Sequence, residues 1–282
     1  MVRVRYSFGS RHTGRIANIA KQRKEFPKIV QEVIDMTDIV IEVIDARFIE
    51  ETRNEELENY ILSLGKKLIY VMNKADLIDF RNFKSSLRPY VLVSTHERFG
   101  SVKLRNLLKQ LSKKVEHKKI NRDNLNKTLI GVIGYPNTGK STLINFLVGR
   151  PVAKTGNEAG FTKGLQKLSL TKELMILDSP GVIPAKEYSM SDKNKMSRQT
   201  LLSARSSGKV KDPELSVQYL INDLPGVIER HYKLDGEYED SELLLEELAI
   251  RSNFKKKGNK PDVERAARVI LTDWQNGKIK IK

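Results

Sequence analysis

The order of two short motifs constrains this chain of 282 residues more than any other feature. The first, Asn73-Lys74-Ala75-Asp76, has the N-K-x-D pattern that is typical of guanine recognition. The second, residues 134–141, matches G-x-x-x-x-G-K-[ST], the pattern of a phosphate-binding loop. The phosphate motif usually comes first along a chain and the base motif second. Because both motifs are intact here in the reversed order, the sequence predicts a circularly permuted nucleotide-binding domain.

The phosphate motif has the local context that its chemistry needs. An apolar run over residues 128–133 precedes it, and a helical pattern begins at Lys140. Glycines let the backbone N–H groups of such a loop surround phosphate groups, and the start of the following helix adds a favourable dipole. We expect Lys140 to reach the β- and γ-phosphates and the Ser141 hydroxyl to bind Mg²⁺. Nucleotide contacts are expected from Asn137, Thr138, Gly139, Lys140, Ser141 and Thr142.

Two segments downstream carry candidates for contacts to Mg²⁺ and to the terminal phosphate. Asp178-Ser179-Pro180-Gly181 ends an apolar run, which predicts that Asp178 holds Mg²⁺ and that the Gly181 N–H meets the γ-phosphate. The glycine-flanked residues 160–164 contain Thr162, our candidate for a switch threonine that closes on Mg²⁺ and the γ-phosphate. Thr155 is a competing candidate, and an ordinary flexible loop is the alternative interpretation. We assign Lys140, Thr162 and Gly181 to the catalytic site.

Guanine specificity depends on Asp76. Its carboxylate can accept hydrogen bonds from the N1–H and the exocyclic amine of guanine, whereas adenine would leave the carboxylate unpaired. We expect Asn73 to hold the loop and the base edge, and the stem of Lys74 to lie over the ring. The adjacent pair Ser94-Thr95, which ends a third apolar run, is expected to supply a backbone contact to the base oxygen.

Apolar runs that alternate with helical patterns predict the architecture. This alternation favours a mostly parallel sheet with helices on both faces, and therefore an α/β fold. Strands are expected at residues 39–45, 68–72, 90–93 and 128–133, and a hairpin at 166–170 and 174–177. Helices are expected at residues 54–64, 102–115 and from 140 to 148.

The segments divide the chain into three predicted parts. Residues 1–36 form a basic amino-terminal helical arm, whose helical periodicity is interrupted near Pro27. Residues 37–190 form the permuted α/β core. Residues 191–282 form a small all-helical domain, because from there the periodicity is helical. Its helices are expected near residues 214–222, 241–251 and 261–275.

The charge balance predicts a polyanionic partner. Lys and Arg number 51 against 35 Asp and Glu, which gives a formal net charge of +16. Such a balance is typical of proteins that bind nucleic acid or an anionic membrane surface. The densest positive stretch is residues 103–127. No apolar run is long enough for a membrane span and cysteine is absent, so we expect a cytoplasmic protein without membrane partners, disulfides or thiol chemistry.

With these motifs the sequence resembles the YlqF/RbgA group of circularly permuted GTPases, which are assembly factors for the large ribosomal subunit. The resemblance covers nearly the whole chain and includes Asp45-Ala46-Arg47 and the tail from Pro261 to Lys278. It implies binding of GTP or GDP with Mg²⁺, a P-loop GTPase core and a helical carboxyl-terminal domain that contacts rRNA. Two positions depart from the group pattern: Phe48 follows the Asp-Ala-Arg segment and Ala159 precedes Gly160, in places where the group has proline.

Conventional GTPases place a water-orienting glutamine directly after D-x-x-G, where this chain has Val182. We therefore expect slow hydrolysis unless another group replaces the glutamine. Asn137 could help to bind K⁺ beside the phosphates, as in related potassium-dependent GTPases. His12 could reach the γ-phosphate and position water, as a histidine near the start of the group does, or it could be a solvated or RNA-facing side chain. In the third hypothesis the partner supplies the stabilising charge.

The leading functional prediction is a GTP-hydrolysing switch that binds rRNA and the precursor of the large ribosomal subunit. The alternative is an RNA-binding scaffold in which GTP is a structural ligand and physiological turnover is small. A tRNA-modifying GTPase is disfavoured because the chain offers no second catalytic domain, and kinase chemistry is disfavoured by Asp76. We expect a monomer and no DNA partner.

Overall fold

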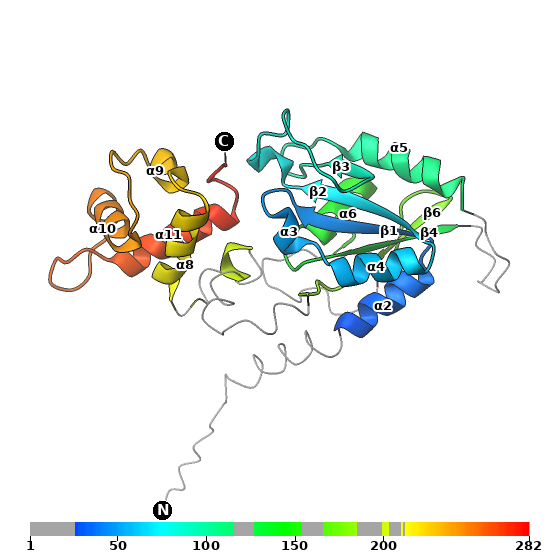
Figure 1. Cartoon of the computed structure of the whole chain (residues 1–282), viewed down its shortest axis with the longest axis horizontal. Coiled ribbons are helices and arrows are strands. Elements are labelled where there is room, and N and C mark those ends of the chain that lie inside the picture. Colours follow the sequence, from blue (N-terminus) through cyan, green and yellow to red (C-terminus); the bar gives the residue numbers. More distant parts are fainter. Residues whose placement is uncertain are drawn as a thin grey trace, which may run out of the picture.

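The computed structural model describes residues 26–115, 127–153, 166–184, 199–202, 210 and 212–281. Within them, a six-stranded sheet with helices on its faces lies beside a group of helices from the carboxyl-terminal third of the chain (Figure 1). The strands are β1 (Ile39–Asp45), β2 (Lys67–Asn73), β3 (Tyr90–Leu92), β4 (Thr128–Gly134), β5 (Gln166–Ser169) and β6 (Leu174–Asp178).

The order of the strands is β3-β2-β1-β4-β6-β5. All neighbours pair in parallel except β5, which pairs with β6 in an antiparallel hairpin. In the β1–β2 pair, Asp45 at the end of β1 lies opposite Asn73 at the end of β2. Because the carboxyl ends of parallel strands meet at one edge, every strand-ending motif of the sequence lies at the same edge of the sheet. The predicted parallel sheet and its hairpin are confirmed.

The two faces of the sheet are covered by different helices. Strand β1 is buried throughout, and its alternate side chains pack on opposite faces. Val40 and Ile44 belong to the apolar cluster that includes side chains of α2 (Phe26–Met36) and α4 (Glu55–Ser63). Ile39, Ile41 and Val43 belong to the cluster that includes side chains of α5 (Ser101–Ser112) and α6 (Lys140–Val148).

Helix α2 belongs to the core and not to a separate arm. Its buried side chains Val30, Val33 and Ile34 pack in the same cluster as α4. Pro27 stands in the first turn of α2, which begins at Phe26, and in that turn a missing N–H costs nothing. The last eleven residues of the predicted arm over residues 1–36 therefore belong to the core. Residues 1–25 lie outside the described part of the chain.

The carboxyl-terminal helices form a third apolar cluster. Asp212, Asp240 and Asp262 each cap the start of a helix by accepting a backbone N–H from the first turn. Among the described residues, the three predicted helices are found at their expected places, together with the short helix α9. They are α8 (Pro213–Asp223), α9 (Val227–Tyr232), α10 (Ser241–Arg251) and α11 (Val263–Gln275).

This helical cluster continues into the α/β core. Phe48, Tyr135 and Ile183 come from the core, yet they pack with the buried side chains of α8, α10 and α11. Phe48, just before the single-turn helix α3 (Ile49–Thr52), meets the ring of Trp274 edge to face, with 5.8 Å between ring centroids. The contact joins the segment after β1 to the last helix of the chain.

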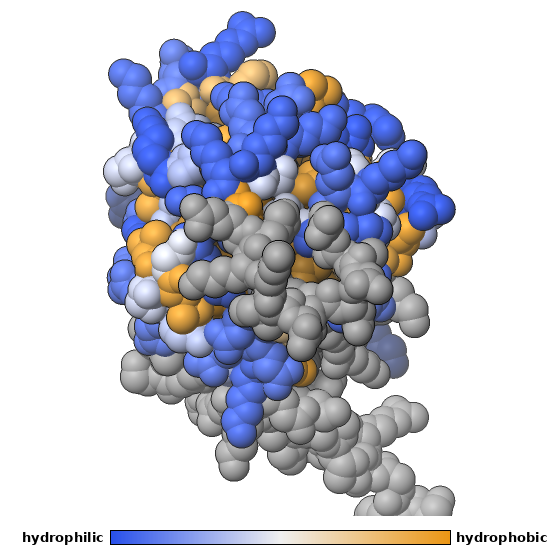
Figure 2. Space-filling model, turned by 90° about the vertical axis from the view of Figure 1, so that its right-hand side faces the viewer, coloured by the Kyte–Doolittle hydropathy of each residue, from blue (hydrophilic) through white to orange (hydrophobic). Residues whose placement is uncertain are grey.

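The surface beside α5 is strongly basic. Lys103, Lys109, Lys113 and Lys114 are exposed on and just after this helix, and residues 101–115 include no acidic side chain. Figure 2, turned toward the side of the sheet beside α5, shows hydrophilic side chains over the upper part of that face. Among the described residues, no helix has the length and apolar character to cross a bilayer.

Candidate nucleotide-binding site

The phosphate loop joins β4 to α6 through a turn that only glycine can form. At Gly134, with φ of +144°, an added Cβ would lie 2.4 Å from the carbonyl oxygen of Val43. At Gly139, with φ of +97°, it would lie 2.3 Å from the side-chain amide of Asn73. Both glycines therefore let neighbouring strands approach the loop closely, and Gly139 permits contact with the base motif.

Lys140 is held inside this turn. Its Nζ donates hydrogen bonds to the carbonyls of Gly134 at 3.1 Å and Tyr135 at 2.8 Å. Burial lowers the pKa of Lys140 to about 8, against the opposing effect of Asp178. The ammonium group is thus aimed at the centre of the loop, where phosphate oxygens can replace the two carbonyls as its partners.

Two oxygen donors lie together at the start of α6. The Ser141 hydroxyl donates to Asp178 Oδ2 over 3.0 Å, and Asp178, at the end of β6, is fully buried. The structure therefore brings together the two predicted Mg²⁺ ligands that it describes. The third, Thr162, lies outside the described residues, as do Thr155 and His12. Hydroxyl and carboxylate oxygens are the donors that Mg²⁺ prefers, so this pair fits the ion.

The chain after Asp178 closes against the phosphate loop. An added Cβ at Gly181 would lie 2.7 Å from Pro136 Cα and 3.0 Å from Lys140 Nζ. The N–H of Val182 donates to the Gly134 carbonyl at 3.2 Å. The Val182 side chain is buried in the cluster that packs on α2 and α4, so this position offers no group that could orient water.

The base motif is tied to the phosphate loop. Asn73 Nδ2 donates to the carbonyl of Thr138 over 2.8 Å, and the Thr138 hydroxyl donates to the Tyr135 carbonyl at 3.0 Å. Oδ1 of Asn73 is buried and has no hydrogen-bond partner among the described residues. The predicted role of Asn73 in holding its loop agrees with this geometry, and its Oδ1 remains an acceptor for a ligand.

Asp76 lies at the rim of the expected base site. It belongs to the short 3₁₀ turn η1 (Ala75–Leu77), and its side chain is 8% exposed. The N–H of Ser94 already donates to the Phe99 carbonyl at 3.2 Å, and Ser94 Oγ accepts from the Glu97 N–H. Of the predicted pair, Thr95 is therefore the residue whose backbone donor is left for a base oxygen.

Sequence reasoning assigned no role to the Asp45–Arg47 pair. Arg47 donates to both carboxylate oxygens of Asp45, at 3.0 and 2.9 Å, and Lys74 Nζ donates to Asp45 Oδ2 at 2.8 Å. Burial alone would raise the pKa of Asp45, but Arg47 and Lys74 outweigh it and hold that pKa well below its usual range. Lys74 adopts φ of +60° at the start of η1. Its ammonium is thus held by Asp45 at the end of β1.

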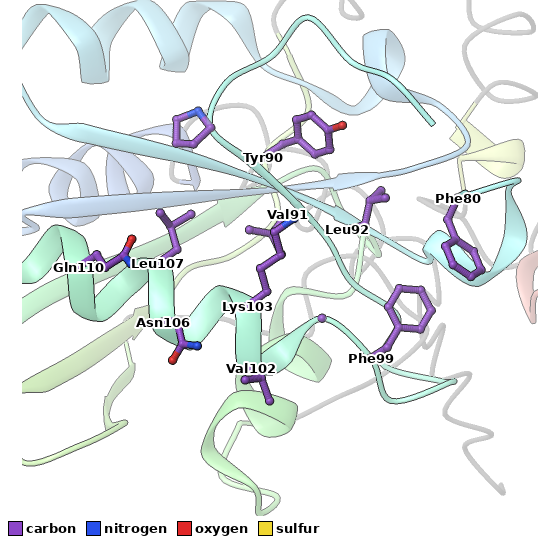
Figure 3. A pocket seen from close by; sticks show the side chains of 12 residues that line it. Phe80, Tyr90, Val91, Leu92, Phe99, Val102, Lys103, Asn106, Leu107 and Gln110 are labelled. Atoms are coloured by element: carbon purple, nitrogen blue, oxygen red, sulfur yellow. The ribbon is translucent and has the colours of Figure 1, made fainter. Parts of the chain in front are cut away.

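An apolar groove lies along the β3 edge of the sheet, with a volume of about 870 Å³. Figure 3 shows Phe80 and Phe99 at one end of the groove and α5 along one side. The groove contains neither the phosphate loop nor the base motif, and the rings of Phe80 and Phe99 pack 5.2 Å apart behind the Ser94–Phe99 bridge. The groove is therefore separate from the candidate nucleotide site.

Comparison with known proteins extends these observations. A family model described as 50S ribosome-binding GTPase matches residues 129–212. The matched span begins in β4 and includes the phosphate loop, whereas the base motif at residues 73–76 precedes it. This is the arrangement that a rotated chain order produces.

Two curated relatives match most of the chain. An uncharacterized GTP-binding protein of Methanocaldococcus jannaschii is 36% identical over 257 residues, which cover 89% of this chain and 65% of the relative. Nuclear GTP-binding protein NUG1 of Saccharomyces cerevisiae is 31% identical over 296 residues, which cover 93% of this chain and 56% of the relative. The chain thus spans between about half and two thirds of the length of these relatives.

A solved structure shares the fold over both parts of the chain. The crystal structure of GNP-bound YlqF from T. maritima superposes with a TM-score of 0.60 at 23% identity. The match covers 90% of this chain and 95% of that structure. The combination of a permuted α/β core with carboxyl-terminal helices is therefore shared.

Proposed function

Because this chain belongs to the circularly permuted GTPases, we propose that it binds GTP and GDP and hydrolyses GTP slowly, as a switch in assembly of the large ribosomal subunit. One observation carries the proposal. The base motif after β2, the phosphate loop after β4 and the Asp178–Gly181 turn after β6 converge at one edge of a parallel sheet. Each motif supplies a different part of guanine-nucleotide recognition.

The residues of the site have distinct roles in this proposal. Ser141 and Asp178 hold Mg²⁺, which supplies positive charge for the phosphate oxygens. Lys140 contacts the β- and γ-phosphates, and the Gly181 N–H meets the γ-phosphate. Thr162 closes over the same group when GTP is bound.

Turnover by the isolated chain is expected to be slow because Val182 is buried and apolar. One of three groups takes over the role of the water-orienting glutamine. They are a K⁺ ion held with the help of Asn137, the imidazole of His12, and a group of the ribosomal partner. Equal turnover in Na⁺ and K⁺ removes the first of these, and unchanged stimulated turnover in His12→Ala removes the second. If both results are obtained, the partner remains as the source.

The contact between the two parts of the chain supports a switch. Tyr135 of the phosphate loop and Ile183, two residues after Gly181, both pack in the apolar cluster of the helical domain. Gain or loss of a γ-phosphate contact at Gly181 therefore acts on residues that touch this domain. We expect GTP analogues and GDP to give different affinities for the large subunit.

The partner is expected to be rRNA of the large subunit. The exposed lysines of α5 form a basic face without acidic neighbours on the same helix, which suits contact with phosphates. Binding should weaken steeply as salt rises, because each phosphate contact releases counterions. Affinity for the subunit that is independent of salt would exclude this face as a phosphate-binding surface.

The first experiment measures GTP turnover in potassium buffer with and without purified large ribosomal subunits. Strong stimulation by subunits supports the triggered GTPase. The buried Val182 keeps one rival open, an RNA-binding scaffold with GTP as a structural ligand. Absence of stimulation, together with subunit binding that is the same with GDP and GTP analogues, would favour that scaffold.

A further inference from the structure

Arg47 is an arginine with a buried side chain that lies between the base motif and the helical domain. Its side chain has no exposed surface. The guanidinium lies 4.4 Å from the ring centroid of Trp274, and Nη1 donates to the Trp274 carbonyl at 3.3 Å. Its other nitrogens make the two-bond pair with Asp45. Arg47 thus has one side on the sheet and the other on α11.

The contacts continue from Asp45 to the base motif. Asp45 Oδ2 accepts both from Arg47 Nη2 at 2.9 Å and from Lys74 Nζ at 2.8 Å. Lys74 is the second residue of the base motif and precedes Ala75 and Asp76. A row of four side chains therefore runs from the helical domain to the base motif: Trp274, Arg47, Asp45 and Lys74.

A second contact joins the same two parts. The N–H of Ile281 donates to the carbonyl of Leu77, the residue after Asp76, at 3.0 Å. Gly277, with φ of +73°, lies next to the Leu77 side chain. A Cβ added at Gly277 would be 3.2 Å from the Leu77 methyl groups. Figure 1 shows the carboxyl-terminal tail beside the turn that follows β2. The tail therefore packs directly on the 3₁₀ turn that carries Asp76.

We infer that Arg47 is a positioning residue for guanine recognition, through which the helical domain and its tail become part of the base site. Trp274 holds Arg47, Arg47 orients Asp45, and Asp45 fixes the ammonium of Lys74 while the tail supports Leu77. The inference rests on the proposed binding of GTP and GDP. It concerns the base end of the nucleotide and is separate from the γ-phosphate contact at Gly181.

The physical basis is the cost of leaving Asp45 with fewer partners. Asp45 is buried, so its charge is stable only while both cations are close. Without the Arg47 side chain, Asp45 keeps the backbone N–H of residue 47 and the ammonium of Lys74 as partners. Lys74 is then the one cation of the pair that remains, so it must neutralise the carboxylate alone and its position in the base motif is less fixed. Coupling between two sites is reciprocal, so a bound guanine must also strengthen the seating of the tail.

The first test measures the dissociation constant for GDP of wild type and of Arg47→Met. Loss of Arg47 is expected to raise that constant by about tenfold or more. Arg53→Met is the matched control, because Arg53 also pairs with a carboxylate, Glu58, through two nitrogens. Among the described residues its ion pairs are with Glu50, Glu55 and Glu58, and none is with Asp45 or with α11. The control should change GDP affinity less than about threefold. Equal effects of the two variants would overturn the inference.

The second test uses hydrogen exchange at the Ile281 amide, whose acceptor is Leu77. In wild type, saturation with GDP should slow this exchange. In Arg47→Lys, a positive charge remains for Asp45, but a lysine cannot bond both carboxylate oxygens and the Trp274 carbonyl in one plane. The GDP-dependent slowing should therefore be lost in this variant. GDP-dependent slowing of the same size in wild type and Arg47→Lys would overturn the inference.

These outcomes separate the inference from the proposed function. If wild type does not bind GDP, the proposed function fails. If wild type binds GDP while Arg47→Met binds it equally well, only the role of Arg47 fails. Circular dichroism of each variant reports whether it is folded. If Arg47→Met does not fold, Arg47→Lys is used for both the GDP titration and the hydrogen-exchange measurement.

Discussion

The side-chain amide of Asn73 donates a hydrogen bond of 2.8 Å to the backbone carbonyl of Thr138, 65 residues further along the chain. The bond joins the proposed base-reading motif to the proposed phosphate-binding loop. It forms because β2 and β4 flank β1 in one parallel sheet, so their carboxyl ends lie close together whatever their order in sequence. The permuted chain therefore keeps the geometry of a single nucleotide pocket.

Gly139→Ala is expected to disrupt this junction. The added methyl group would collide with Asn73 Nδ2 at 2.3 Å, so GDP affinity should fall by on the order of tenfold or more. Gly149→Ala is the control, because Gly149 ends the same helix with φ of +80° and has nothing within 4 Å of an added Cβ. Both variants lose about 1–2 kcal/mol of stability to the left-handed backbone. GDP titration and thermal melting separate the two effects, and unchanged affinity in Gly139→Ala would contradict the collision.

Asp76→Asn should exchange guanine for xanthine specificity. An amide donates where the carboxylate accepts, and xanthine presents a carbonyl oxygen where guanine has its exocyclic amine. GDP should bind on the order of a hundredfold more weakly or worse, while xanthosine diphosphate gains affinity. Asp79→Asn, at an exposed position three residues later, should change neither value. Competition titrations with the two nucleotides measure the exchange, and undiminished GDP binding would remove Asp76 from the base site.

The motifs at strand ends could be predicted from sequence because their chemistry is local. The phosphate loop, the base motif and the Asp178–Gly181 turn each place all their groups within a few residues. The Arg47–Trp274 contact could not be found in this way, because its partners are 227 residues apart and its existence depends on how the helical domain packs. The tail contact at Leu77 and the occupied N–H of Ser94 depend on tertiary structure for the same reason.

Glu42→Gln should flatten the pH dependence of stability. Burial and the nearby carboxylate of Glu58 raise the pKa of Glu42 above its ordinary value of 4.5. The folded protein therefore holds this proton where the unfolded chain has released it, so this group's contribution to the free energy of unfolding falls as pH rises from about 4.5 through the raised pKa. Within that window the contribution changes by at most about 1.4 kcal/mol per pH unit.

A glutamine at position 42 is neutral at every pH, and its oxygen can keep the hydrogen bond from the Asn54 N–H, which is 2.7 Å in the wild type. Arg53 and Tyr70, which also face the Glu42–Glu58 pair, are unchanged. Urea unfolding from pH 5 to 8 should give a smaller decline with pH for this variant than for wild type. Glu56→Gln, on the exposed face of α4, should follow wild type. Parallel curves for wild type and Glu42→Gln would contradict a raised pKa at Glu42.

Lys66→Met should destabilise the protein by about 1 to 3 kcal/mol. Helix α2 has no basic residue in its last turn, and Lys66 supplies the missing charge by donating to the carbonyls of Ile34, Asp35 and Thr37 at 2.6 to 2.7 Å. Lys67→Met, at the exposed neighbouring position, is the control. Denaturant unfolding measures both, and equal stabilities of the two variants would exclude a capping role for Lys66.

Secondary structure followed the sequence wherever an apolar pattern was long. Strand β1 and helix α10 have the bounds that the pattern predicts. The short helix α9 was missed, because its six residues follow Gly226 and have no capping side chain. At α2, Pro27 stands in the first turn of a helix whose position depends on packing against the sheet, and the residues before it lie outside the described part of the chain.

The two edge strands of the sheet affect how readily the protein aggregates at high concentration. An open sheet presents unpaired backbone groups at both borders, and another molecule can extend it there into an aggregate. Here β3 is three residues long and follows Pro89, which has no N–H, while β5 is four residues long and has exposed Lys167 in its middle. Short edge strands that carry a charge or follow a proline offer few backbone groups for hydrogen bonds with a strand from another molecule. The α/β core should therefore stay dispersed at concentrations at which longer, apolar borders would precipitate.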